Sequence, residues 1–246
     1  MKVFIGTSGW SYEHWKGIFY PKEIKANQYL SYYSNVFKTV EINNTFYNLP
    51  GEEIFKRWKK QVPLGFVFSV KANRYLTHAR RLEVERKSVD LFFKRVLLLE
   101  DFLGPILFQL PPNLNKSKVL SGFLNLIPKE FKIVFEFRNK DWYTEDIFDL
   151  LKKRKIIFCI HDHSQAPSPF WVTSDKVYMR MHGPSGSYTG RYSKKELEAL
   201  SEKVLGLKEK VSEVYCYFNN DAKGYAVENA RNLLKVINSK SRGALE

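Results

Sequence analysis

The stretch Ile133-Val134-Phe135-Glu136-Phe137-Arg138 is short, rich in β-branched and aromatic residues, and ends in charged side chains. This composition predicts a buried β-strand whose carboxyl end carries the charges. Runs of the same kind recur along the chain, and together they are Val3–Thr7, Thr39–Asn43, Phe66–Lys71, Ile106–Leu110, Ile133–Phe137, Ile156–Ile160, Lys176–Met181 and Glu213–Phe218.

Helix-length segments lie between most of these runs, namely Asn27–Ser34, Gly51–Lys60, Glu85–Leu99, Lys118–Leu126, Thr144–Lys153, Lys194–Lys210 and Ala226–Ser239. Strands that alternate with helices predict a parallel sheet. Eight strand–helix units in 246 residues favour a closed barrel, the α/β fold of a single TIM-type (β/α)₈ domain, over an open sheet. We expect the barrel to occupy residues 1–239 and a frayed polar tail to occupy residues 240–246.

Composition narrows the class of protein. The chain has 40 Lys and Arg residues against 26 Asp and Glu, a net charge of +14, and 44% of its residues are hydrophobic. It contains no apolar run long enough for a membrane span and begins with a strand-like segment rather than a signal peptide, so we expect a cytoplasmic protein. Cys159 and Cys216 are outside any CxxC pair, which predicts buried free thiols. The net charge of +14 is compatible with a protein that binds an anionic partner. It is equally compatible with a basic chain that binds nothing anionic.

Polar side chains gather where the predicted strands end. Because chemistry in a (β/α)₈ barrel sits at the carboxyl ends of the strands, these residues are the site candidates. They are Thr7, Trp10, Glu41, Asn43, Lys71, Gln109, Glu136, Arg138, Asp162, Arg180, His182 and Asn219. Charges facing outward would be buried unpaired beneath helices, whereas charges facing inward would neutralise one another. A purely structural ion-pair network is the alternative interpretation.

Side-chain alternation assigns the charged residues to faces of their strands. If Asp162 points inward, then His161 points toward a helix, which argues against a metal site made by His161 and His163. The three carboxylates Glu41, Glu136 and Asp162 could instead hold one divalent cation, Mg²⁺ or Mn²⁺.

Two loops on the same face are basic and aromatic. The loop after the third strand carries Arg74, His78, Arg80 and Arg81, and the loop after the seventh carries Tyr188 and Arg191. Arginine forks suit phosphate oxygens, and Trp10 and Tyr188 are the aromatic residues best placed to stack on a ligand.

The motifs Gly6-Thr-Ser-Gly-Trp10, Glu41-Ile-Asn43-Asn-Thr45-Phe46-Tyr47, Phe108-Gln109-Leu-Pro111-Pro112, Glu136-Phe-Arg138 and Arg180-Met-His182-Gly183 occur in an order that resembles the YecE-like family, also called domain of unknown function 72. The resemblance spans residues 3 to about 238 and implies a TIM-type barrel without an established activity. A distant likeness of relatives to endonuclease IV-type barrels implies DNA binding. That enzyme's trinuclear zinc site needs many histidines, whereas only His182, with His78 in a loop, is placed for it here.

Two functions follow as hypotheses. The first is an enzyme, such as a phosphodiesterase-like hydrolase, that holds an anionic, phosphate-bearing substrate with Lys71, Arg138 and Arg180. Glu41 and Glu136 would divide the acid and base roles, with His182 as proton shuttle. The second is a nucleic-acid-binding protein that uses the basic rim of Arg74, Arg80, Arg81 and Arg191, with or without repair-type hydrolysis. A scaffold without chemistry would leave the strand-end charges unexplained, and the oligomeric state is left open.

Overall fold

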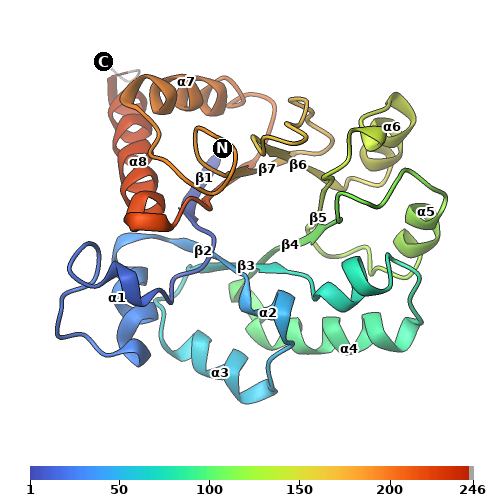
Figure 1. Cartoon of the computed structure of the whole chain (residues 1–246), viewed down its shortest axis with the longest axis horizontal. Coiled ribbons are helices and arrows are strands. Elements are labelled where there is room, and N and C mark those ends of the chain that lie inside the picture. Colours follow the sequence, from blue (N-terminus) through green and yellow to red (C-terminus); the bar gives the residue numbers. More distant parts are fainter. Residues whose placement is uncertain (244–246) are drawn as a thin grey trace.

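A computed structural model describes residues 1–243 of the chain (Figure 1). The strands are β1 (Lys2–Thr7), β2 (Thr39–Ile42), β3 (Val67–Lys71), β4 (Leu103–Gln109), β5 (Ile133–Glu136), β6 (Ile157–His161), β7 (Lys176–Met181) and β8 (Glu213–Phe218). They form one sheet in the order β1-β8-β7-β6-β5-β4-β3-β2, and each hydrogen-bonded pair is parallel. The ends of this sheet meet, which confirms the predicted TIM-type barrel.

Helices surround the strands, as Figure 1 shows. They are α1 (Tyr29–Val36), α2 (Asn44–Tyr47), α3 (Glu52–Lys60), α4 (Arg86–Val96), α5 (Val119–Leu124), α6 (Glu145–Lys153), α7 (Lys194–Leu205) and α8 (Tyr225–Gly243). Shorter 3-10 or π turns cover Glu13–Trp15, Ala26–Gln28, Tyr75–Ala79, Leu97–Phe102, Lys140–Trp142 and Ala222–Gly224. None of the helices within residues 1–243 is long and apolar enough to cross a membrane.

The structure differs from the sequence prediction in three places. The connection between β6 and β7, residues 162–175, contains no helix, so one of the eight expected strand–helix units is incomplete. The short helix α2 was not predicted. Helix α8 runs through residues 240–243, so this part of the tail is helical rather than frayed, and residues 244–246 lie outside the described part.

A tyrosine joins the two strands that close the barrel. Strands β1 and β2 pair directly at their carboxyl ends. Further back, the hydroxyl of Tyr33 from α1 accepts the backbone N–H of Thr7 at 2.9 Å and donates to the carbonyl of Thr39 at 3.1 Å. A Cβ atom on Gly6 would lie 2.3 Å from that same carbonyl, so glycine is needed where the strands come this close.

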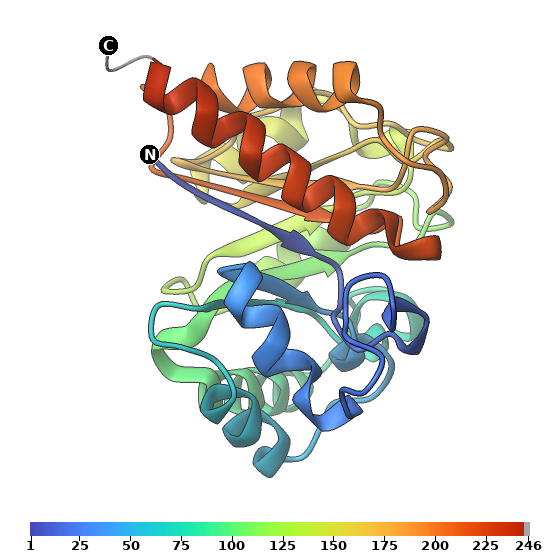
Figure 2. The same cartoon turned by 90° about the vertical axis from the view of Figure 1, so that its left-hand side faces the viewer.

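The core has two layers. Between the strands and helices lies the large outer layer, which includes Cys216, and inside the barrel lies a smaller one. The inner layer consists of Leu107, Val134, Ile157, Cys159, Tyr178, Tyr215 and Tyr217. Both cysteines are buried free thiols, as predicted. Figure 2 shows β1 leading away from the N-terminus and α8 returning toward it, so the strand ends that carry the site candidates form the face opposite the N-terminus.

Candidate active site

Arg180 lies at the centre of a buried charge cluster inside the barrel. Its Nε and Nη2 donate to the two carboxylate oxygens of Glu41 at 3.0 and 2.9 Å, and its Nη1 donates to Glu136 at 2.8 Å. Further contacts reach Ser8 Oγ at 3.2 Å and His182 Nε2 at 3.5 Å. All five guanidinium N–H groups therefore have partners. Burial opposes the charge, but Glu136 and Glu41 outweigh burial and raise the pKa of Arg180 well above its usual range.

The carboxylate of Glu41 is also held by hydroxyl groups. Ser8 Oγ donates to one of its oxygens and the hydroxyl of Tyr178 donates to the other at 2.6 Å. Asn43 belongs to the same group, because its Nδ2 donates to Ser8 Oγ at 2.6 Å. Thr7, the predicted site residue of β1, instead turns toward α1. Ser8 and Tyr178 are thus members of the cluster that were missing from the predicted site.

Arg138 connects this cluster to the mouth of the barrel. Its Nε donates to Glu136, its Nη2 to His182 Nε2 at 2.9 Å, and its Nη1 to the hydroxyl of Tyr188 at 3.1 Å. A guanidinium has five N–H groups, so two of them have no partner among the described residues. Burial would raise the pKa of Glu136, but Arg138 and Arg180 outweigh it and hold that pKa well below its usual range.

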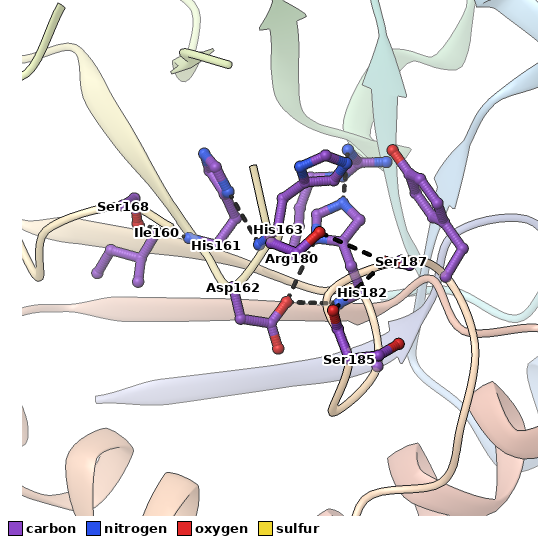
Figure 3. Close-up of polar contacts among 12 residues, drawn as sticks. Ile160, His161, Asp162, His163, Ser168, Arg180, His182, Ser185 and Ser187 are labelled. Carbon is purple, nitrogen blue, oxygen red and sulfur yellow. Dashed lines mark hydrogen bonds and ion pairs between the residues drawn. The ribbon is translucent and has the colours of Figure 1, made fainter. Parts of the chain in front are cut away.

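His182 is held neutral between Asp162 and the arginines. Guanidinium groups only donate hydrogen bonds, so His182 Nε2 must accept from Arg138 and the ring proton must lie on Nδ1. That Nδ1 has no hydrogen-bond partner among the described residues, although it lies 3.4 Å from Asp162 Oδ1, which accepts the backbone N–H of His182 at 2.7 Å (Figure 3). Burial and the charges of Arg180 and Arg138 lower the pKa of His182 well below its usual range. These surroundings give no support to the proton-shuttle role predicted for this histidine.

The inner face of β6 includes Ile157 and Cys159, and side-chain alternation places His161 on the same face. The condition that Asp162 points inward, on which its place in the predicted metal site depended, is therefore not met. Asp162 directly follows the strand. Its two oxygens accept hydrogen bonds from the loop after β7, from the N–H of His182 and the hydroxyl of Tyr192. Burial lowers the pKa of His161 to about 4, and its Nε2 donates to the carbonyl of residue 137 at 2.9 Å.

The predicted set of metal ligands does not come together. Both oxygens of Glu41 and of Glu136 already accept from arginine, and both oxygens of Asp162 accept from the loop after β7. Among residues 1–243, no three His, Cys, Asp or Glu side chains are arranged to hold a metal ion. The carboxylates act as partners of the arginines instead.

Lys71 ends β3 on its inner face, and its Nζ lies 4.0 Å from the centre of the Phe46 ring. Burial and the charge of Arg180 lower the pKa of Lys71 to about 7. The ring of His78 packs nearly perpendicular to the same ring, with ring centres 4.9 Å apart, and its Nδ1 is 2.8 Å from Thr77 Oγ1. Burial and the charge of Lys71 lower the pKa of His78 to about 4.

The remaining predicted site residues at the strand ends are Trp10, Gln109 and Asn219. Trp10 packs edge-on against Trp58 of α3, with ring centres 5.5 Å apart, and so belongs to the packing between loop and helix. Gln109 is partly buried beside Glu136 in the β4–β5 register. Asn219 is partly buried at the end of β8, where its backbone N–H donates to the carbonyl of residue 181.

The predicted basic rim is exposed at the surface. Arg191 forms an ion pair with Glu228 at 3.0 Å, whereas Arg74, Arg80 and Arg81 form none within residues 1–241. Arg80 and Arg81 line a surface hollow of about 370 Å³. A larger hollow of about 960 Å³ lies at the amino ends of β5 to β7, away from the charge cluster.

The loop after β7 is shaped by close packing. Gly183 has a φ of +95°, and a Cβ there would lie 2.1 Å from the carbonyl of Thr189. A Cβ on Gly186 would lie 2.4 Å from the backbone nitrogen of Ser164 in the neighbouring loop. These glycines therefore fold the loop back so that Tyr188, itself at a φ of +66°, reaches Arg138.

Comparison with known proteins gives the family. The family model "Protein of unknown function DUF72" matches residues 4–246, and the chain therefore belongs to this family. The chain is similar to UPF0759 protein YunF of Bacillus subtilis, with 26% identity over 98% of this chain and 96% of the relative. It is also similar to UPF0759 protein YecE of Escherichia coli, with 28% identity over 58% of this chain and 51% of the relative.

Two crystal structures of the family share the fold. The DUF72 family protein TM1631 from Thermotoga maritima has a TM-score of 0.86 at 31% identity, covering 97% of this chain and 100% of that one. The DUF72 family protein EF0366 from Enterococcus faecalis has a TM-score of 0.84 at 25% identity, covering 96% and 95%. The names of these relatives state no substrate and no reaction.

Proposed function

We propose that this DUF72 protein is an enzyme that binds a small anionic, phosphate-bearing substrate at the mouth of the barrel and uses the amine of Lys71 as its reactive group. The observation that supports it best is the difference between the two inner arginines. Arg180 has a protein partner for every donor, whereas two N–H groups of Arg138 have no partner in the part of the chain that the structure describes. Unused guanidinium donors at a barrel mouth are suited to the oxygens of a phosphate.

The reactive group follows by comparing the titratable side chains around Arg138. Glu136 is held by two guanidinium groups, which stabilise its charged form and make it a poor base. His182 accepts from Arg138 through the nitrogen that would have to take up a proton. Lys71 has a pKa lowered to about 7, so near neutral pH a large share of it is the free amine. We therefore assign the acid–base role to Lys71 rather than to the carboxylates or His182.

Binding of inorganic phosphate, measured by calorimetry at pH 7, tests this proposal. Hydrogen bonds from a charged donor contribute about 1.5–3 kcal/mol, so Arg138→Gln should weaken binding about tenfold or more. Arg191→Gln is the matched control, because Arg191 is exposed and already paired with Glu228. The melting temperature of each variant shows whether it is folded. Equal phosphate affinity in the wild type and in folded Arg138→Gln contradicts the proposed site.

A nucleic-acid-binding function is the second candidate. The exposed positions of Arg74, Arg80 and Arg81, and their lack of carboxylate partners within residues 1–241, favour it because phosphate backbones bind such free guanidinium groups. The two functions need different residues. The first needs Arg138 and Lys71 inside the mouth, and the second needs the outer loop.

A further inference from the structure

The amine of Lys71 has an unusual setting for a lysine at the end of a strand. Within residues 1–241, its Nζ makes no hydrogen bond and no ion pair, and its contact is the face of the Phe46 ring at 4.0 Å. The Phe46 ring also packs nearly perpendicular to the His78 ring, and it forms an apolar wall beside the amine. No side chain within residues 1–241 forms a hydrogen bond with Nζ, so the lone pair of the neutral amine is open to a ligand.

The charges of four neighbouring side chains affect the pKa of the Lys71 amine. Arg180 of β7 and Arg138, just after β5, oppose its protonation, whereas Glu136 of β5 and Glu41 of β2 favour it. Arg74 and His78 lie in the loop that follows Lys71, and the charges of Lys71 and Arg74 both act on His78. Burial adds to the effect of the arginines, and the pKa of Lys71 falls to about 7. A desolvated lysine beside other cations is the arrangement that activates an amine as a nucleophile.

We propose that Lys71 Nζ is a nucleophile that forms an imine with an aldehyde or ketone whose phosphate or carboxylate group binds Arg138. This inference rests on the proposed anion site and names the substrate class as a carbonyl compound. The neutral amine adds to the carbonyl carbon, and the carbonyl oxygen takes up a proton to become a hydroxyl. That hydroxyl leaves as water with a proton from the former amine nitrogen, which gives the protonated imine. Overall the step takes up one proton from solvent and needs no oxidant or reductant.

The site is suited to the product of this step. A protonated imine carries the same single positive charge as the lysine ammonium that it replaces. The face of the Phe46 ring attracts either cation, and the charges of Glu136 and Glu41 favour either one. Forming the protonated imine from the neutral amine adds one positive charge to the cluster, and this charge offsets part of the negative charge that the phosphate brings to Arg138.

Trapping with pyridoxal 5′-phosphate, an aldehyde that carries a phosphate group, tests the inference on the full-length protein. The protein is treated at pH 7, reduced with borohydride, digested and mapped by mass spectrometry. Lys132 is the internal reference, because its Nζ is only partly exposed and paired with Glu213 at 2.7 Å. At pH 7, an amine with a pKa of about 7 has roughly a thousandfold larger neutral fraction than an ordinary lysine. We expect Lys71 to be labelled at least about tenfold more than Lys132, the smaller ratio allowing for the weaker nucleophilicity of a less basic amine.

The outcomes separate the imine from the anion site. Labelling at Lys71 that is lost in Lys71→Arg and reduced in Arg138→Gln supports both. Pyridoxine 5′-phosphate lacks the aldehyde; if it binds in an Arg138-dependent way while Lys71 is not labelled preferentially, the imine is refuted and the anion site remains. If pyridoxal without phosphate labels Lys71 as well as the phosphate ester does, the nucleophile stands and the anion site is refuted. No binding of pyridoxine 5′-phosphate and no preference for Lys71 refutes both.

Discussion

Two regions of one charge cluster differ in how completely their donors are used. Around Arg180, deep in the barrel, each guanidinium N–H has a partner and two carboxylates are neutralised. Around Arg138 and Lys71, nearer the mouth, two guanidinium N–H groups and an amine have none among the described residues. The same residue types thus serve structure in one region and are open to a ligand in the other. The fraction of N–H donors that have a protein partner distinguishes the two regions better than their charge or burial does.

The largest effect that this comparison predicts is on stability, in Arg180→Ala. Removing Arg180 leaves Glu41 without a cation and Glu136 with Arg138 alone, both inside the barrel. Breaking a buried ion pair by removing one partner costs about 3–5 kcal/mol, and we expect a loss of that size in the free energy of unfolding.

Denaturant-induced unfolding at pH 7 measures this loss. Arg191→Ala is the control, because it breaks an exposed pair with Glu228 that should contribute less than about 1 kcal/mol. If both variants lose the same small amount, the deep cluster does not stabilise the barrel and the comparison between the regions fails.

The strands of this barrel could be predicted from the sequence. For some strands, the sequence also predicts which residues face the barrel interior. For β2, β5 and β7, the residues Glu41, Glu136 and Arg180 identify the inner face, because a charge beneath a helix would be buried without a partner. The structure bears this out through the ion pairs that these three side chains form.

The same reasoning fails where a strand is apolar on both faces. In β6, Ile157 and Cys159 face inward while Phe158 and Ile160 pack outward, so alternation by itself could not tell which side His161 or Asp162 would take. A related difficulty arises at the end of β1, where Thr7 and Ser8 are adjacent and equally polar, so alternation could not show which of them faces the barrel interior. The pairing of Ser8 with Glu41 depends on how β1 meets β2, which is a long-range property of barrel closure.

A smaller effect is expected in the pH dependence of stability. Burial lowers the pKa of Lys71 to about 7 in the folded protein, against about 10.4 in the unfolded chain. Between these values the unfolded state binds more protons, so stability rises with pH, and the cost of burying the ammonium is fully present below pH 7. Lys71→Met removes that cost and should stabilise the protein at pH 6 by about 1–2 kcal/mol, a figure reduced for solvent screening at a partly buried site.

Unfolding measured at pH 6 and at pH 9.5 shows whether this gain shrinks as expected. Lys71→Arg provides a matched control, because a guanidinium stays charged over the whole range and its burial cost cannot vary with pH. If Lys71→Met raises the free energy of unfolding by the same amount at the two pH values, then Lys71 is not desolvated and titrates like an ordinary surface lysine.

The smallest effect on stability is expected at the rim, in the double variant Arg80→Ala/Arg81→Ala. Both side chains are exposed and form no ion pair within residues 1–241, so the free energy of unfolding should change by no more than about 0.5 kcal/mol. Binding to a DNA duplex of arbitrary sequence is the informative measurement. Each phosphate contact adds about 0.9 to the slope of log affinity against log salt, so two lost contacts should lower that slope by about 1.8.

Arg138→Gln is the matched comparison for the rim, because Arg138 is 5% exposed and bonded within the cluster. It should leave the salt slope of DNA binding unchanged while weakening phosphate binding at the mouth. A DNA slope that is the same in the wild type and in the rim variant removes the nucleic-acid function from consideration. A slope that falls in Arg138→Gln as well would mean that the mouth and the rim bind one continuous anion, and that the saturation of donors does not divide the site as proposed.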